Sequence, residues 1–256
     1  MSLTVEAKLR PVYSRPKSMY SITNHYCPGC SHGIVHRLLG EAIDELKICE
    51  DTILVAPVGC AVLAFFYFKV DGCEAAHGRL PAVATGIKRV HPDKIVIAYQ
   101  GDGDLLAIGM AETIHAANRG ENITVIFINN AIYGMTGGQM APTTLLGQKT
   151  KTTPYGREAS QDGYPIRACE LINTLEAPAY IERVSVHNVK AILAAKRAIK
   201  KGLSYQLKGI GYSFIEVLAN CPTNWGLTPL LANKWIEDKM SAYYPLKVFR
   251  DRGGAP

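Results

Sequence analysis

Short apolar runs alternate with stretches of helical periodicity along most of this chain. The runs rich in β-branched residues, which predict strands, are 52–58, 94–100, 123–128, 180–186 and 212–218. The stretches with apolar residues three and four apart, which predict helices, are 31–47, 81–89, 105–118 and 189–202. Strands that alternate with helices form parallel sheets covered on both sides. The pattern therefore predicts an α/β fold with an open, mainly parallel sheet and helices on both faces.

The segments outside this pattern are expected to contact partner chains or to form functional loops. At 256 residues the chain is predicted to form one domain, residues 1–256, because this length is near the upper size for a single core. Segments 1–24 and 225–256 are interpreted as arms that pack on partner chains. Residues 131–165 are rich in Gly, Thr and Pro, and so long a loop in a compact domain is usually functional. Ser31 is expected to cap the first predicted helix.

The distribution of charge argues against two broad classes of partner. The formal net charge is +6, carried largely by the helical stretch 190–208 and the ends of the chain. A solvated helix face explains such a pattern, so no nucleic-acid partner is expected. Residues 1–15 lack the apolar core of a signal peptide, and no apolar run is long enough to span a bilayer. The sequence thus predicts a cytoplasmic protein with no membrane partner.

Two short polar motifs follow neighbouring predicted strands. Gly101-Asp102-Gly103-Asp104 comes directly after strand 94–100, and Asn129-Asn130 comes after strand 123–128. The carboxyl ends of strands in an open α/β sheet are where ligands bind. Glycines let the backbone approach a diphosphate, and backbone N–H groups at a helix start can hold its phosphates. Asp102 and Asn130 would supply the hard oxygens that Mg²⁺ prefers.

This pair of motifs resembles the diphosphate-binding signature of thiamine diphosphate enzymes. The resemblance implies three Mg²⁺ ligands: the Asp102 carboxylate, the Asn130 side chain and the main-chain carbonyl of Ile132. A single Gly-Asp-Gly sequence is usually only a turn, and two unrelated loops are the alternative interpretation.

Cysteines form a second group of candidate ligands. Cys27 and Cys30 form a C-x-x-C motif, Cys60 follows the predicted strand 52–58, and Cys221 follows strand 212–218. In a reducing compartment this motif indicates metal or redox chemistry rather than a structural disulfide. By softness and geometry, four thiolates suit zinc or an iron–sulfur cluster, and a redox dithiol also stays open. The remaining cysteines, interpreted as small buried hydrophobes, are Cys49, Cys73 and Cys169.

Taken together, the motifs resemble those of the β subunits of 2-oxoacid:ferredoxin oxidoreductases. They are CPGCSHG at 27–33, PVGC at 57–60, AHGR at 76–79, GDGD at 101–104, NNAIYGMTGGQ at 129–139 and CPTN at 221–224. The resemblance is closest to the branched-chain (2-oxoisovalerate) type, with the 2-oxoglutarate type a near neighbour. It implies a thiamine-diphosphate-binding fold and a [4Fe–4S] cluster on Cys27, Cys30, Cys60 and Cys221, close to the coenzyme.

The resemblance also implies a set of coenzyme-contacting residues. They are Gly59, Cys60, His77, Gly101, Asp102, Gly103, Asp104, Asn130, Ile132, Tyr133 and Thr136. Simpler interpretations exist for some of them: His77 as a structural histidine, Thr136 as part of an ordinary glycine turn, and Tyr133 as a core residue. His32, next to Cys30, is an alternative zinc ligand. Some members of the family carry a basic residue where this chain has Leu63, which favours an aliphatic substrate here.

The activity that the resemblance implies is oxidative decarboxylation of a 2-oxoacid with coenzyme A, giving an acyl-CoA and CO₂. The cofactors implied are thiamine diphosphate, Mg²⁺ and the [4Fe–4S] cluster, with ferredoxin as electron acceptor. An α subunit carrying the pyrimidine-binding domain would supply the activating Glu, and further small subunits would include a ferredoxin-like one. The chain alone is therefore predicted to be inactive. The rival hypotheses are a non-redox thiamine-dependent decarboxylase or synthase component with a structural zinc site, and a non-catalytic scaffold subunit.

Overall fold

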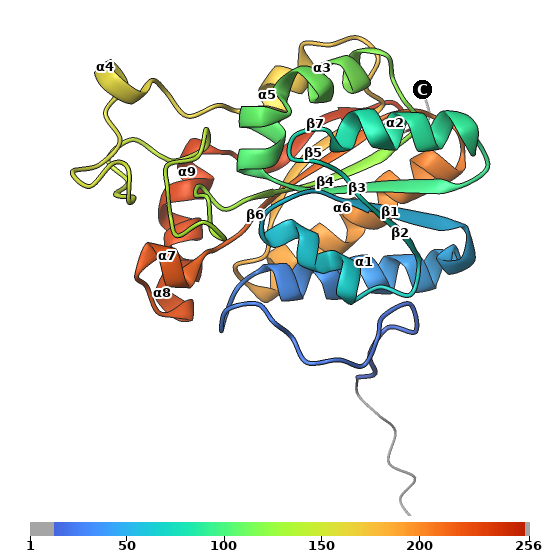
Figure 1. The fold of residues 1–256 in the computed structure, drawn as a ribbon, viewed down its shortest axis with the longest axis horizontal. Helices are drawn as coiled ribbons and strands as arrows, with labels where there is room; N and C mark the ends of the chain where they lie inside the picture. Colours follow the sequence, from blue (N-terminus) through green and yellow to red (C-terminus); the bar gives the residue numbers. More distant parts are fainter. Residues whose placement is uncertain (1–12, 254–256) are drawn as a thin grey trace, which may run out of the picture.

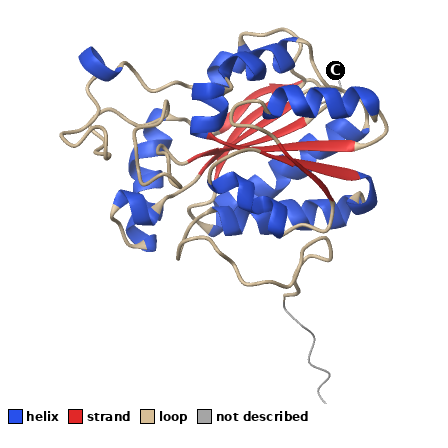
Figure 2. Ribbon diagram, in the orientation of Figure 1, coloured by secondary structure: helices blue, strands red, loops and turns tan. Residues whose placement is uncertain are grey.

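A seven-stranded sheet forms the centre of the computed structural model, which describes residues 13–253. The strands are β1 (Thr52–Ala56), β2 (Asp71–Glu74), β3 (Ile95–Gly101), β4 (Thr124–Asn129), β5 (Tyr180–Ser185), β6 (Ser213–Leu218) and β7 (Lys247–Asp251). Their order is β2-β1-β3-β4-β6-β5-β7, and every pairing is parallel except that of β7 with β5. Figure 2 shows the strands gathered in the middle of the molecule with helices on both sides. The predicted open, mainly parallel α/β fold is confirmed.

Helices cover both faces of this sheet. They are α1 (His32–Leu46), α2 (Leu80–Val90), α3 (Met110–Asn118), α4 (Ala159–Asp162), α5 (Ala168–Asn173), α6 (Val189–Leu207), α7 (Pro222–Trp225), α8 (Pro229–Trp235) and α9 (Ser241–Tyr243). Helices α1 and α6 lie against one face, whereas α2, α3 and α5 lie against the other (Figure 1). Strands β4 and β6 are buried along their whole length because both of their faces are covered. This double cover explains why they appear in the sequence as continuous apolar runs.

The predicted helix 105–118 is divided at Gly109 into a π-helical and an α-helical part. The structure has a π-helical turn, η3 (Gly103–Ile108), and α3 begins only at Met110. Between them, the Gly109 N–H donates to the Asp104 carbonyl at 2.8 Å. A Cβ at Gly109 would lie 2.6 Å from the Gly78 carbonyl oxygen. The wider π-helical turn therefore brings the backbone at Gly109 into direct contact with the 77–78 turn.

Other elements lie outside the predicted pattern. Strands β2 and β7 occupy the two edges of the sheet, and β2 is mostly exposed, so neither has a full apolar run. Within 131–165 the only helix of the described chain is the single turn α4, which extends away from the sheet (Figure 1). The Arg157 guanidinium organises this loop by donating to backbone carbonyls, among them those of Thr144 at 2.7 Å and Gly163 at 2.9 Å. Two 3₁₀ turns, η1 (Cys49–Asp51) and η2 (Cys60–Phe66), flank β1.

The C-terminal segment, predicted to be an arm on a partner chain, packs on the chain's own sheet, and its contact with a partner stays a prediction. After α8, the π turn η4 (Ile236–Met240) and α9 bury Ile236, Met240 and Tyr244 against Leu145 and Leu218. The segment then returns as β7 beside β5. Of the predicted N-terminal arm, residues 1–12 lie outside the described part of the chain. Within the part described, the Ser18 hydroxyl donates to the Gly40 carbonyl of α1 at 3.0 Å.

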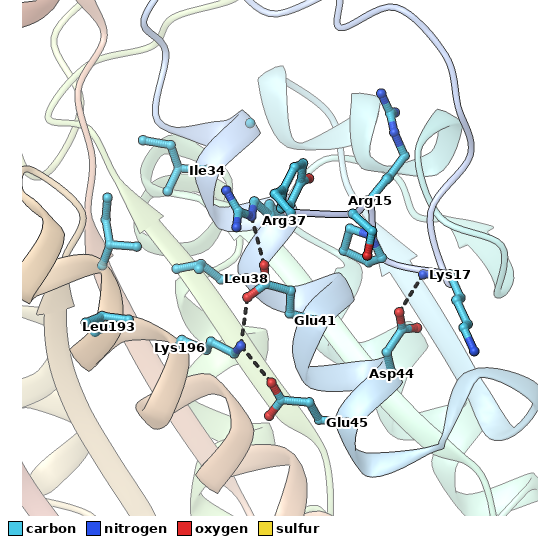
Figure 3. A pocket seen from close by; sticks show the side chains of 15 residues that line it. Arg15, Lys17, Ile34, Arg37, Leu38, Glu41, Asp44, Glu45, Leu193 and Lys196 are labelled. Atoms are coloured by element: carbon cyan, nitrogen blue, oxygen red, sulfur yellow. Dashed lines mark hydrogen bonds and ion pairs between the residues drawn. The ribbon is translucent and has the colours of Figure 1, made fainter. Parts of the chain in front are cut away.

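A network of ion pairs joins α1 to α6 beside a cavity of about 740 Å³. Lys196 of α6 contacts Glu41 at 2.8 Å and Glu45 at 2.7 Å, and Arg37 also pairs with Glu41 at 2.8 Å (Figure 3). Lys200 reaches the second oxygen of Glu45 at 2.7 Å. The charged groups thus neutralise one another and link the two helices on this face. Within residues 13–253 no helix is both long and apolar enough to cross a membrane.

Candidate active site

A pocket of about 110 Å³ lies at the carboxyl ends of the central strands. Strands β3 and β4 pair in parallel with Gly101 opposite Ile128, so the loops that follow them leave from the same edge of the sheet. All the residues predicted to contact the coenzyme line this pocket: Gly59, Cys60, His77, Gly101, Asp102, Gly103, Asp104, Asn130, Ile132, Tyr133 and Thr136. The structure therefore brings the whole predicted set together, while the role of each residue stays a prediction.

Asp102 provides a buried carboxylate at the floor of the pocket. One of its oxygens accepts a hydrogen bond from the Gly103 N–H at 2.8 Å, and the other accepts from the Thr143 hydroxyl at 2.6 Å. Burial raises the pKa of Asp102 to about 6, and these donors only partly offset it. Among the described residues no Lys, Arg or His forms an ion pair with it. A bound cation would supply the missing positive charge, so the site fits a divalent metal.

The loop after β4 turns so that its two asparagines serve different purposes. Ala131 adopts a left-handed conformation, with φ of 57°, which a non-glycine residue rarely adopts. Asn129 stabilises this turn, because its side-chain oxygen accepts from the Ala131 N–H and its amide donates to buried Glu216 at 2.8 Å. Asn130 lies on the pocket side, where its oxygen accepts from the Ile132 N–H at 3.3 Å. Asn130 and Ile132 are therefore placed beside Asp102.

A buried ion-pair network lies behind this turn. Arg183 of β5 is fully buried and donates to Glu216 of β6 at 2.8 Å and to Glu170 of α5 at 2.5 Å. Glu216 in turn accepts from Asn129 at 2.8 Å. A single charged network thus connects two strands and one helix to the loop that carries Asn130. The network restricts the position of this loop.

Asp104 also lines the pocket, but its carboxylate oxygens already accept hydrogen bonds from neighbouring protein groups. Its oxygens accept from His77 Nδ1 at 2.5 Å, from the Gly78 N–H at 2.7 Å and from Gln100 Nε2 at 2.7 Å. These contacts hold the 77–78 turn over the pocket and leave the other ring nitrogen of His77 free of Asp104. Asp104 thus anchors the 77–78 turn, while coenzyme contacts by His77 and Asp104 stay predictions.

A strip of backbone, Tyr133-Gly134, borders the pocket on the side of the cysteines, and one of these, Cys60, itself lines the pocket. A Cβ at Gly103 would lie 1.9 Å from Cε1 of Tyr133, so only glycine allows the ring to lie across the GDGD turn. A Cβ at Gly134 would lie 3.3 Å from Cys60 Sγ and 3.5 Å from Cys221 Sγ. Further along, the Thr136 hydroxyl donates to Gln139 at 2.6 Å. This contact lies within the turn itself, and a coenzyme contact by Thr136 stays a prediction.

The four predicted cluster cysteines gather beside this strip. Burial, together with the neighbouring thiols, Cys221 and Cys27 among them, raises the pKa of Cys30 to about 12 and that of Cys60 to about 11. Cys27 is exposed, and all the cysteines in the described chain are free thiols. No group of three or more His, Cys, Asp or Glu side chains in residues 13–253 forms a closed metal site as arranged. The donor set nevertheless fits iron–sulfur or zinc chemistry, because buried thiols need a cation to ionise.

His32 and the remaining cysteines differ in their surroundings. His32 is buried, its Nδ1 contacts the Tyr99 hydroxyl at 2.7 Å, and its ring stacks on Tyr26. Burial lowers the pKa of His32 to about 4, so it is neutral at pH 7. Cys169 is fully buried, as predicted, whereas Cys49 and Cys73 are only half-buried. The two half-buried thiols lie at or near the β2 edge of the sheet, where cover is incomplete.

Comparison with known proteins agrees with this geometry. Residues 58–217 match the model of the thiamine pyrophosphate enzyme C-terminal TPP-binding domain. The chain is 42% identical to the 2-oxoglutarate synthase subunit KorB of Methanocaldococcus jannaschii over 78% of this chain and 70% of that protein. It is 52% identical to the ketoisovalerate oxidoreductase subunit VorA of Methanothermobacter thermautotrophicus over 95% of this chain. The chain belongs to the thiamine-diphosphate-binding β subunits of 2-oxoacid:ferredoxin oxidoreductases.

The relatives differ in length from this β subunit. The chain spans 51% of the length of the ketoisovalerate relative. A solved 2-oxoglutarate:ferredoxin oxidoreductase from Magnetococcus marinus, with 2-oxoglutarate, coenzyme A and succinyl-CoA bound, shares the fold with a TM-score of 0.76. That likeness covers 99% of this chain and 90% of the other at 24% identity.

Several side chains that hold the site together were missed by reasoning from the sequence. Asn220 and Asn224 flank Cys221, and both contact groups distant in sequence. Tyr26, next to Cys27, donates its hydroxyl hydrogen to the Cys60 carbonyl at 2.9 Å. The available signal was adjacency, since each of these residues lies within three positions of a predicted ligand. The β subunit therefore surrounds its cysteines with polar side chains from the same loops.

Proposed function

We propose that this chain is the coenzyme-binding subunit of an enzyme that oxidatively decarboxylates a 2-oxoacid to an acyl-CoA. Electrons would pass through a [4Fe–4S] cluster on Cys27, Cys30, Cys60 and Cys221 to ferredoxin. The observation that carries the proposal is the position of Gly134, which lies against the sulfurs of Cys60 and Cys221 and next to the pocket residue Tyr133. This arrangement would put an electron acceptor beside the coenzyme.

The residues that line the pocket have the chemistry that Mg²⁺ and thiamine diphosphate need. Asp102, Asn130 and the Ile132 carbonyl would hold Mg²⁺, and the backbone N–H groups near Gly103 would hold the diphosphate. Thiamine diphosphate would supply the carbon chemistry when bound, because its thiazolium ring can accept the electron pair that decarboxylation releases. The chain's own part is to bury Asp102, keep the 77–78 turn fixed through Asp104, and hold Tyr133 across the GDGD turn. These contacts orient the diphosphate end of the pocket.

The substrate proposed is a branched-chain 2-oxoacid, with 2-oxoglutarate as the alternative. No Lys or Arg is among the residues that line the pocket in the described chain, so its lining offers no permanent positive charge to a second carboxylate. Leu63 lies in η2 and packs against the hydrophobic core. The 52% identical relative is named a ketoisovalerate oxidoreductase subunit, whereas the 42% identical one is named for 2-oxoglutarate. The lack of Lys and Arg in the described pocket lining favours the aliphatic substrate. The higher identity to the ketoisovalerate relative favours it as well.

Activity would require partner subunits. The carboxylates that line the pocket in residues 13–253 are Asp102 and Asp104, and both are occupied by hydrogen bonds. The glutamate that activates the aminopyrimidine would therefore come from an α subunit with the pyrimidine-binding domain. Val58 and Met135 line the pocket and are 41% and 50% exposed, which provides apolar surface for that partner. Further small subunits, one of them ferredoxin-like, would carry electrons onward.

Metal analysis of the chain purified without oxygen tests the proposal. About four irons and four sulfides per chain, with a paramagnetic signal after dithionite reduction, are expected for one cluster on four cysteines. The complex with its partner subunits should then turn over 2-oxoisovalerate faster than 2-oxoglutarate. Zinc without iron in protein kept anaerobic throughout would contradict the redox function. That result would leave a non-redox thiamine-dependent decarboxylase or synthase component as the better description.

A further inference from the structure

The side chain of Asn224 connects Cys221 to the strip that borders the coenzyme pocket. Asn224 lies in the single-turn helix α7, three residues after Cys221. Its Nδ2 donates to the Gly134 carbonyl at 2.9 Å and to Cys221 Sγ at 3.3 Å. An amide nitrogen carries two hydrogens, so both bonds can form at once. Asn224 thus contacts a candidate cluster ligand and the neighbour of Tyr133 through one group.

The bond to Gly134 fixes which end of the Asn224 amide faces the sulfur. A backbone carbonyl only accepts hydrogen bonds, so it must face the NH₂ group and not the amide oxygen. The second hydrogen of that NH₂ is then directed at Cys221 Sγ. The amide oxygen lies on the other side, where a Cβ at Gly138 would be 3.1 Å from it. The contacts with Gly134 and Gly138 therefore orient the Asn224 amide so that its NH₂ group donates to the sulfur.

We propose that Asn224 is a positioning residue that sets the reduction potential of the iron–sulfur group bound through Cys221. This inference rests on the proposed function. A hydrogen bond to a ligand sulfur stabilises the more negative, reduced state of a cluster and so raises its potential. The same residue fixes the Gly134 backbone, so the donor keeps its place relative to the pocket. Asn224 acts through the sulfur of Cys221 and does not touch the substrate.

Two variants remove the donor in different ways. Asn224→Ala deletes the amide, whereas Asn224→Asp keeps its shape but replaces both N–H groups with a charged acceptor. Thr223→Val is the matched control, because Thr223 is the exposed neighbour on the same helix turn and its side chain makes no hydrogen bond in the described structure. The full chain is purified without oxygen, and its cluster is titrated with dithionite while the paramagnetic signal is followed.

The expected result is a lower potential in both Asn224 variants. Loss of one donor should shift the one-electron equilibrium about tenfold toward the oxidised cluster, about 59 mV, with Thr223→Val like the wild type. Unchanged potentials in a wild-type-like iron–sulfur chain would overturn the inference while the proposed function stands. A shift in Asn224→Asp alone would also overturn it, because charge rather than the hydrogen bond would be the cause. If the wild type holds no iron, the proposed function fails, and the inference fails with it.

If Asn224→Ala loses its iron, the uncharged variant Asn224→Ser takes its place, because Asn224→Asp also adds a charge. Ser offers one shorter donor, so its potential should lie between those of Asn224→Asp and the wild type. An Asn224→Ser potential equal to that of Asn224→Asp would contradict a role for the hydrogen bond. A purely structural role for Asn224 predicts changed iron retention without any shift of potential in the chains that keep their cluster.

Discussion

Ser31 and Asn220 exchange hydrogen bonds across 189 residues of sequence. The Ser31 N–H donates to the Asn220 side-chain oxygen at 3.0 Å, and the Asn220 N–H donates to the Ser31 hydroxyl oxygen at 3.0 Å. Ser31 follows Cys30 and Asn220 precedes Cys221, so this pair joins the two loops that carry these cysteines. The Ser31 hydroxyl oxygen accepts from Asn220 and makes no capping hydrogen bond to α1, in contrast to the prediction from sequence. The Asn220 amide also donates to Asn233 of α8 at 2.8 Å.

We expect Ser31→Ala or Asn220→Ala to destabilise the fold by about 1–3 kcal/mol each, because each leaves a buried N–H without an acceptor. The double variant should cost less than the sum of the two, since losing either hydrogen bond lets the two loops separate and so weakens the other bond. Urea unfolding of the full chain under anaerobic conditions measures these free energies. Ser21→Ala is the control, because Ser21 is exposed. Strictly additive losses would mean that the two residues act independently.

Gly103 and Gly101 differ in how they tolerate a side chain. A Cβ at Gly103 would lie 1.9 Å from the Tyr133 ring, whereas a Cβ at Gly101 meets nothing within 4 Å. We therefore expect Gly103→Ala to destabilise the chain by about 1–3 kcal/mol through overpacking, and Gly101→Ala to have little effect on stability. Urea unfolding of the two variants makes this comparison.

The double variant Gly103→Ala with Tyr133→Ala tests the cause of that loss. Removing the ring should relieve the contact, so the double variant should be more stable than the sum of the single losses predicts. If Gly103→Ala is as stable as Gly101→Ala, the ring moves aside at no cost, and the close packing at Gly103 has no consequence for folding.

The sequence predicted the core of this fold because its central strands are buried on both faces. Strands β3, β4 and β6 carry continuous apolar runs, and their ends fix where the GDGD and Asn-Asn motifs lie. Once the pairing of β3 with β4 is known, the approach of Asp102 and Asn130 follows from topology. The candidate pocket was predictable for this reason.

The features that the sequence did not predict depend on contacts between segments that are distant in sequence. Edge strands β2 and β7 have mostly exposed residues, so they lack the apolar pattern of a strand. The widening of η3 comes from the packing of Gly109 against Gly78, which no local propensity records. The bonds of Ser31 and Asn224 join loops that are far apart along the chain. Ser31 is also a favourable helix cap, so local reasoning assigned its hydroxyl to the wrong partner.

Asp102 should be required for coenzyme binding but not for folding. Asp102→Ala removes a proposed metal ligand, so we expect thiamine diphosphate with Mg²⁺ to bind at least about 100-fold more weakly, since changes even to supporting residues around a metal cost 10–100-fold. The metal-free variant should unfold at the same or a higher urea concentration, because an uncompensated buried carboxyl is removed. Titration calorimetry on the complex with its partner subunits measures the binding.

The control for this change is Asp93→Ala, since Asp93 is exposed on the turn before β3. It should bind the coenzyme like the wild type. If Asp102→Ala instead leaves both coenzyme affinity and turnover of the complex unchanged, the chain acts as a scaffold and the pocket has no catalytic role.

The ion pairs between α1 and α6 should make stability depend on pH in the acid range. Hydrogen bonds from Lys196 and Lys200 hold the pKa of Glu45 below its usual value near 4.5. The unfolded chain therefore takes up a proton at Glu45 before the folded chain does, so this contribution is complete above about pH 4.5 and is lost as pH falls further. The pairs are partly exposed, so we expect Glu45→Gln to cost less than about 1 kcal/mol at pH 7.

Thermal denaturation at pH 7 and at pH 3.5 separates this contribution from others. The melting temperatures of Glu45→Gln and the wild type should differ at pH 7 and converge at pH 3.5, where the wild-type carboxylate is protonated in the unfolded chain. At 1 M salt the difference at pH 7 should also shrink, because screening then acts within about 3 Å. Glu50→Gln is the control, since Glu50 is exposed and its carboxylate forms no ion pair in the described structure. A difference between Glu45→Gln and the wild type that persists unchanged at pH 3.5 would assign the effect to packing of the side chain between α1 and α6.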